Sequence, residues 1–211
     1  MGNRIAVIDY GMGNLHSIQK ALEYIGGEVL VTGNPADLPD ADRVVLPGIG
    51  AFGDGMANLR KSGFVNALRN EIIENKKPFL VICLGMQLLA DKSYEFGEHE
   101  GLGFVPGEVK KFDFLDNSEK LPVPHVGWNS LHFRTTHPIL EGVRDGSHFY
   151  FVHSFHFVPQ GENSLIGMSN YGYDFPAAIG YENIFATQFH PEKSQNDGLK
   201  ILKNFISWRP T

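Results

Sequence analysis

The chain has 211 residues, 42% of them hydrophobic and 20% charged, which is the composition of a soluble globular protein large enough for one domain. Its formal net charge of −6 argues against nucleic acid or an anionic membrane as a partner, because phosphate contacts need clustered Lys and Arg. The single cysteine cannot form an intramolecular disulfide, and the apolar runs are too short for a signal peptide or a membrane span, so we expect a cytoplasmic protein.

Short apolar runs alternate with helical patterns in the first half of the chain. Strands are predicted over residues 5–8, 28–32, 43–46 and 79–82, and helices over residues 14–25, 56–60, 64–75 and 84–91. This alternation is typical of parallel strands joined by right-handed crossovers. Ligands bind such sheets at the carboxyl ends of the strands, where Asp9, residues 47–50 and Cys83 should converge.

The second half is rich in aromatic and β-branched residues. It predicts further strands, followed by a closing helix over residues 198–208; the strands cover residues 121–133, 147–157, 164–168, 175–180 and 184–189. The sequence has no internal repeat or linker, so residues 1–211 are predicted to form one α/β domain. Its central sheet should be mostly parallel, flanked by helices, with additional antiparallel strands in the second half.

Cys83 lies between a predicted strand and a predicted helix, and Gly85 follows two residues later. A tight strand-to-helix turn is the geometry of a nucleophile elbow, which projects a side chain above the sheet. It also places the thiol at a helix N-terminus, where the dipole favours the thiolate. From this stretch alone, a buried structural cysteine is the favoured interpretation, because free cysteines are commonly buried.

Two further stretches favour the nucleophile. His190 follows a predicted strand, and Glu192, two residues on, would point the same way in extended chain and could orient the imidazole. Glycines in residues 47–50 would let backbone N–H groups near Ile49 and Gly50, together with that of Leu84, form an oxyanion hole. Taken singly, His190 could be a surface histidine before a turn proline, and residues 47–50 could be only a turn. The remaining histidines lack metal-ligand spacing, and neither a metal nor a cofactor is expected.

Six motifs resemble those of the class I (triad) glutamine amidotransferases, and within that class the glutaminase subunits of imidazole glycerol phosphate synthase. They are D-Y-G-M-G-N-L at residues 9–15, L-P-G-I-G-A-F at 46–52, I-C-L-G-M-Q at 82–87, P-H-V-G-W-N at 124–129, Y-F-V-H-S at 150–154 and Q-F-H-P-E-K-S at 188–194. The resemblance extends from about residue 4 to residue 208.

The resemblance implies hydrolysis of L-glutamine by Cys83, His190 and Glu192 through a γ-glutamyl thioester. It also implies substrate-binding residues, namely Gln87, Glu95, His153, Ser154 and Phe155. The ammonia would pass to a (β/α)8-barrel cyclase subunit, the partner in a heterodimer that makes imidazole glycerol phosphate and aminoimidazole carboxamide ribotide for histidine biosynthesis. Residues implied at the face toward that partner are Trp128, Asn129, Tyr150 and Lys193.

The sequence departs from this family at Val81, where Gly is usual, and at Val126, where Met is usual. Neither change removes a catalytic group. They leave open a paralogous glutaminase subunit whose barrel partner amidates a surface-polysaccharide sugar. A stand-alone cysteine hydrolase of γ-glutamyl substrates and a non-catalytic binding subunit are further alternatives. The complete Cys–His–Glu set argues against the last, and the segment 124–129 argues against a stand-alone enzyme.

Overall fold

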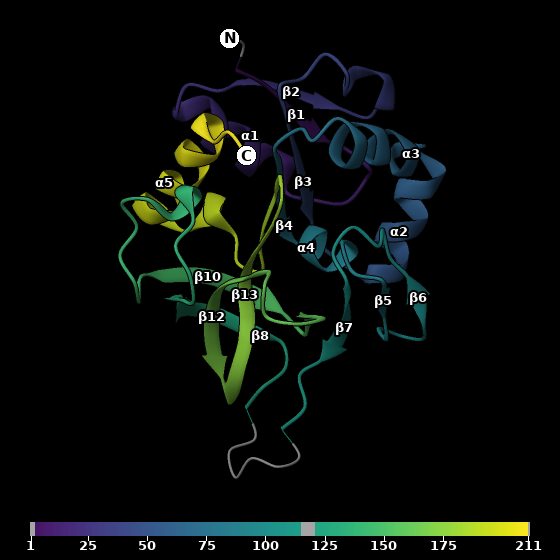
Figure 1. Cartoon of the computed structure of the whole chain (residues 1–211). Helices are drawn as coiled ribbons and strands as arrows, with labels where there is room; N and C mark the ends of the chain where they lie inside the picture. The colour runs from purple at the N-terminus through teal and green to yellow at the C-terminus, as the bar shows by residue number, and fades with distance from the viewer. Residues whose placement is uncertain (1–2, 115–120, 211) are drawn as a thin grey trace.

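The computed structural model describes residues 3–114 and 121–210 and is built around one eight-stranded mixed sheet (Figure 1). Five neighbouring strands run parallel, in the order β2 (Glu28–Thr32), β1 (Arg4–Ile8), β3 (Arg43–Gly48), β4 (Phe79–Cys83) and β14 (Ile184–Thr187). The sheet continues with antiparallel strands, β13 (Tyr173–Tyr181), β12 (Leu165–Tyr171) and β9 (His132–Phe133). The predicted fold class, an α/β domain with a mostly parallel centre, is therefore confirmed.

Helices cover both faces of the parallel part. On one face lie α1 (Leu15–Tyr24) and α5 (Gln195–Ser207); on the other lie α2 (Phe52–Lys61), α3 (Phe64–Leu68) and α4 (Leu84–Leu88) (Figure 1). Strand β1 shows how both faces of the sheet are buried. Ala6 and Ile8 belong to the hydrophobic cluster on one face, and Ile5 and Val7 belong to the cluster on the other. Successive side chains of a strand point to opposite faces, so a sheet covered on both sides needs continuous apolar strands.

Helical segments differ from the predictions mainly at their ends. The helix predicted over 64–75 is helical from Phe64 to Glu74, but it changes to a π-helix over Arg69–Glu74. The helix predicted over 84–91 ends at Leu88 because backbone N–H groups of residues 102–105 donate to the carbonyls of Leu88, Leu89 and Ala90. Single 3₁₀ turns cover Pro35–Asp37, Pro138–Leu140 and η4 (Pro191–Lys193).

Two small sheets pack beside the main one. The first pairs β10 (His148–His153) with β8 (His125–Ser130), and the second has the order β11 (Phe155–Pro159), β7 (Gly107–Lys111), β5 (Lys92–Ser93) and β6 (His99–Glu100). The single strand predicted over 147–157 was wrong, because the chain leaves one sheet at Ser154 and joins the other. Strands β5, β6 and β7 were not predicted, since they are short and carry charged residues.

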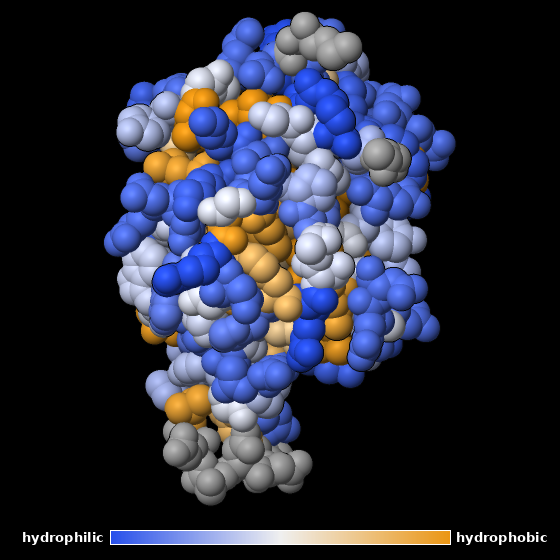
Figure 2. All heavy atoms as spheres, turned by 60° about the vertical axis from the view of Figure 1, so that its left-hand side comes forward, coloured by the Kyte–Doolittle hydropathy of each residue, from blue (hydrophilic) through white to orange (hydrophobic). Residues whose placement is uncertain are grey.

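The surface is largely polar, with local apolar exposure. Figure 2 shows one face on which hydrophilic residues predominate and a band of hydrophobic side chains lies near the centre. Within residues 3–114 and 121–210, no helix is long and apolar enough to cross a membrane.

Candidate active site

Cys83 is the last residue of β4 and the N-cap of α4, with backbone angles φ +55° and ψ −110°. A positive φ is strained for a residue with a side chain and is typical of functional turns. The turn is tight because Gly85 packs against the neighbouring strand: a Cβ added there would lie 2.4 Å from the carbonyl oxygen of Leu46 and 2.8 Å from Val81 Cγ1. The turn predicted from the sequence is present, and Val81 occupies the space beside its glycine.

The order of the parallel strands brings distant segments to this turn. Gly48, at the end of β3, is in register with Cys83, and β14 pairs with β4 on the other side. The chain that leaves β14 reaches His190 three residues after Thr187. Segments separated by more than a hundred residues therefore meet at one edge of the sheet, as ligand-binding residues of parallel sheets do.

His190 and Glu192 form a buried pair. His190 Nδ1 donates to Glu192 Oε1 at 2.7 Å, and their side chains are 2% and 3% exposed. Glu192 lies in the 3₁₀ turn η4 rather than in extended chain, so the contact exists for a different reason from the one expected. Strand β10 holds this turn: Tyr150 accepts from His190 N at 2.9 Å and donates to Ser194 Oγ at 3.0 Å.

The other imidazole nitrogen of His190, Nε2, is buried and makes no hydrogen bond to the residues that the structure describes. Burial alone would lower the pKa of His190. Its charge interaction with Cys83, and then its hydrogen bond and charge interaction with Glu192, outweigh burial and hold the pKa above its usual value. An imidazolium and a thiolate stabilise each other in this way, which is how cysteine nucleophiles are activated. The site can therefore support a proton-loaded His190 next to a nucleophilic sulfur.

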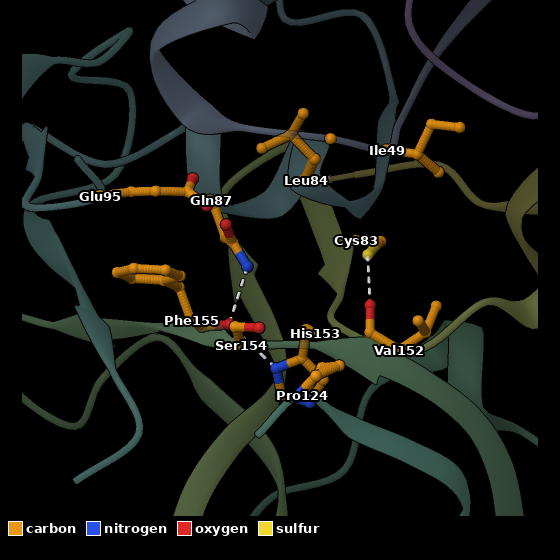
Figure 3. Close-up of a pocket in the computed structure, with 11 residues that line it drawn as sticks. Ile49, Cys83, Leu84, Gln87, Glu95, Pro124, Val152, His153, Ser154 and Phe155 are labelled. Atoms are coloured by element: carbon orange, nitrogen blue, oxygen red, sulfur yellow. Dashed lines mark hydrogen bonds between the residues drawn. The ribbon is translucent and has the colours of Figure 1, made fainter. Parts of the chain in front are cut away.

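A pocket of about 270 Å³ opens beside Cys83 (Figure 3). All residues that the sequence suggested for the oxyanion hole or for substrate binding line this pocket, namely Ile49, Gly50, Leu84, Gln87, Glu95, His153, Ser154 and Phe155. Pro124 and Val152 line it as well and were not predicted. Ser154 and Phe155 reach the pocket because the chain changes sheets there. His190 and Glu192 are not among the lining residues.

Polar groups in the pocket are held by backbone partners. Glu95 accepts from Phe52 N at 2.6 Å, and burial raises the pKa of its carboxyl despite that hydrogen bond. Gln87 Nε2 donates to the carbonyl of Phe155 at 2.8 Å, and His153 Nδ1 donates to the same oxygen at 2.9 Å. Burial lowers the pKa of His153 to about 3, so this imidazole is neutral at physiological pH. Each side chain therefore presents a defined polar atom to the pocket.

The four residues expected to face a partner lie on β8, β10 and η4. Lys193 Nζ is 5.7 Å from the ring centre of Tyr150, whose ring lies 6.2 Å from that of Trp128. Asn129 Nδ2 donates to the carbonyl of Asn170 at 2.7 Å. Trp128 is 48% exposed and Val126 56%, so strand β8 presents two apolar side chains to solvent.

One buried side chain near the sulfur was missed by the sequence analysis. Gln188 is fully buried, and its Nε2 lies 3.7 Å from Cys83 Sγ. It stands two residues before His190 in the quoted Q-F-H-P-E-K-S motif, and this i, i+2 spacing along a strand end was the available signal.

Comparison with known proteins agrees with this geometry. The sequence profile of the glutamine amidotransferase class-I family matches residues 6–208. The chain is 48% identical over 205 residues to imidazole glycerol phosphate synthase subunit HisH of Sulfurimonas denitrificans, covering 97% of this chain and 98% of that protein. It is 49% identical to the subunit of the same name from Geobacter sulfurreducens, covering 96% and 97%, and 50% identical to that of Aquifex aeolicus, covering 96% and 95%.

Solved structures share the fold at low sequence identity. PurLQS from Thermotoga maritima superimposes with a TM-score of 0.76 at 19% identity, covering 98% of this chain and 99% of that one. A structure described as a glutamine amidotransferase gives 0.74 at 19% identity, covering 97% and 99%. The profile match over nearly the whole length, the relatives at about half identity and the shared fold lead to one conclusion: the chain belongs to the glutamine amidotransferase class-I family.

Proposed function

We propose that this chain is the glutaminase subunit of imidazole glycerol phosphate synthase, which hydrolyses L-glutamine and supplies the ammonia for histidine biosynthesis. The observation that carries the proposal is the near-complete, roughly half-identical match to subunits of that name, joined to a Cys–His–Glu set whose cysteine lines one pocket. L-Glutamine occupies the pocket, and no cofactor takes part in the chemistry.

The reaction begins with Cys83 as thiolate and His190 as imidazolium. The sulfur attacks the side-chain amide carbon of glutamine and forms a tetrahedral intermediate. Its oxyanion is stabilised by backbone N–H groups of Ile49, Gly50 and Leu84, all of which belong to residues lining the pocket. His190 transfers its Nε2 proton to the leaving nitrogen, so the C–N bond breaks and ammonia departs from a γ-glutamyl thioester.

Hydrolysis of the thioester completes the cycle. His190, now neutral, takes a proton from water while the water oxygen attacks the acyl carbon. The C–S bond breaks, the new carboxylic acid loses its proton to solvent, and glutamate and the thiolate–imidazolium pair remain. Glu192 keeps the Nδ1 proton in place through both steps, which leaves Nε2 as the atom that exchanges protons. The lack of any partner on Nε2 among the described residues supports this role.

The partner is a (β/α)8-barrel cyclase subunit, bound as a heterodimer at the face formed by Trp128, Asn129, Tyr150 and Lys193. Two features support this surface. Its largest apolar side chain, Trp128, is 48% exposed, and the surface is connected to the catalytic turn through Tyr150, whose backbone hydrogen-bonds with His190 and Ser194. Interfaces with aromatic anchors of this kind are typical of stable protein contacts.

Glutamate release from L-glutamine tests the proposal. The purified chain should turn over slowly alone and much faster with the histidine-pathway cyclase and its nucleotide ligand, and Cys83→Ala should abolish release in both settings while the protein stays folded. No increase with that cyclase, in a chain whose thiol still reacts with a glutamine-analogue alkylator, would transfer the assignment to a sugar-amidating barrel partner. Turnover by Cys83→Ala would refute the nucleophile.

A further inference from the structure

We infer that the side-chain amide of Gln188 is a catalytic hydrogen-bond donor to the Cys83 sulfur, and that Gln87 is a positioning residue which fixes the orientation of this amide. The inference rests on the proposed function for its place in the reaction, but the atoms that carry it are independent of substrate and partner. They form one continuous chain of hydrogen bonds from the sulfur to a backbone carbonyl.

The carbonyl of Phe155 sets the direction of the chain. A carbonyl oxygen can only accept, so the atom of Gln87 that lies 2.8 Å from it must be the amide nitrogen Nε2. Nε2 carries a second hydrogen, which points to Gln188 at 3.1 Å, and the atom of Gln188 that receives it must be Oε1. The remaining end of the Gln188 amide, Nε2, then faces Cys83 Sγ at 3.7 Å. Each orientation follows from the previous one.

The same carbonyl is held from a second direction. His153 Nδ1 donates to it at 2.9 Å, and His153 Nε2 lies 3.0 Å from Nδ1 of His125. Because the carbonyl requires the proton of His153 on Nδ1, His153 Nε2 accepts and His125 donates. Both rings pack among aromatic side chains, so the carbonyl of Phe155 cannot turn away without breaking two buried donors.

Gln188 has no other evident reason to be polar. It is 0% exposed, directly after the end of β14, and a buried amide is costly unless its hydrogen bonds are satisfied. In the described part of the chain, the sulfur makes one other hydrogen bond, with the carbonyl of Val152 at 3.8 Å, and a carbonyl can serve only the protonated thiol. Gln188 supplies the complementary group, a donor that favours the thiolate. The Gln188 amide therefore stabilises the thiolate twice, before the sulfur attacks glutamine and again when the sulfur is released from the thioester.

Alkylation of the thiol by iodoacetamide, measured as a function of pH on the purified chain, tests this directly. The reagent is small and uncharged, and the assay needs neither glutamine nor a partner. Gln188→Met keeps the length of the side chain but removes the donor, so the midpoint of the rate–pH profile should rise by about one pH unit and alkylation below the midpoint should slow about tenfold. An unchanged midpoint would overturn the inference.

Gln87→Met provides an independent test that does not depend on whether Gln188→Met folds. Without Gln87, the Gln188 amide can rotate and present its oxygen to the sulfur, so the midpoint should again rise. Since Gln87 acts through Gln188, the double variant should behave like Gln188→Met alone; additive shifts in the midpoint would refute the positioning role of Gln87.

Thr187→Val is the matched control. It removes a buried hydroxyl that donates to the carbonyl of Phe189, two residues further along the chain, without touching the sulfur, so it should alter stability but leave the alkylation midpoint in place. If the control moved the midpoint as far as Gln188→Met does, the effect would be structural and the inference would fall. If Gln188→Met and Gln87→Met shift the midpoint as expected but the wild-type chain has no glutaminase activity, only the proposed function is refuted, because the alkylation assay does not involve glutamine.

Discussion

The buried pair of His190 and Glu192 permits a quantitative prediction for Glu192→Gln. Two unit charges about 4 Å apart at an effective dielectric of about 20 attract each other by about 4 kcal/mol. The glutamine oxygen can still accept from Nδ1, so the geometry is retained while the charge is lost. Since about 1.4 kcal/mol corresponds to a tenfold change in rate, kcat/KM for glutamine should fall by roughly 10²- to 10³-fold.

The same substitution should change the pH dependence. Glu192 contributes to the raised pKa of His190, so removing its charge lowers that pKa. His190 must be protonated to release ammonia, and the loss of activity at high pH should therefore begin at a lower pH in the variant. The assay is steady-state glutamate release in the presence of the cyclase, with thermal unfolding measured in parallel.

A surface carboxylate serves as the control for this prediction. Glu182 pairs with Lys76 at an exposed position, so Glu182→Gln should leave both kcat/KM and stability nearly unchanged. If Glu192→Gln retained kcat/KM within about threefold of the wild type while folded, with the same high-pH behaviour, an electrostatic role for Glu192 of the size calculated here would be refuted.

Three further predictions follow from the geometry. Gly85→Ala should destabilise the fold by about 1–3 kcal/mol in chemical denaturation, because the new Cβ would overlap the carbonyl of Leu46. Gly33→Ala is the control, since its Cβ would meet only an ordinary van der Waals contact. Equal destabilisation by the two substitutions would count against the close packing of the turn. Burial lowers the pKa of His125 and His156 to about 4 and that of His153 to about 3, below the unfolded value of about 6.5. The unfolded chain therefore binds more protons than the folded one in this range. The free energy of unfolding should fall as the pH drops from 6.5 toward 4, by about 1.4 kcal/mol per pH unit for each histidine. His190, whose pKa is raised, opposes this fall near pH 6.5 and above, where the unfolded chain is not fully protonated, and adds little slope below about pH 5.5. This contribution is the same in His156→Gln, which should therefore reduce the slope of the wild type by about one histidine's share. Unfolding of both proteins at pH 7, 6 and 5 would reveal or refute this difference. Lys193→Ala should weaken cyclase binding in a titration while changing unfolding by less than about 1 kcal/mol, since the exposed contact with Tyr150 is weak; unchanged binding would remove Lys193 from the interface.

The sequence by itself determined the local elements of the parallel half. Continuous apolar runs of four residues bounded by turn signals, such as residues 5–8 and 79–82, are typical of strands covered on both faces, and Gly85 marks the tight turn at Cys83, so both could be predicted from short-range patterns. The same reasoning placed Ile49, Gly50 and Cys83 at strand ends, which is why they meet in one pocket. Resemblance to a known family supplied Gln87, Glu95 and the segment 153–155, which periodicity alone would not have selected.

Only the tertiary structure decided how the distant segments combine. The pairing of β14 with β4, about a hundred residues apart, depends on packing in two separate apolar clusters, and no local pattern encodes it. The change of sheet at Ser154 and the 3₁₀ turn that directs Glu192 to His190 likewise arise from hydrogen bonds to other strands. Gln188 is the clearest case: its residue type suggests a surface position, and it is tolerated in the core because Gln87 and Cys83 satisfy its amide there.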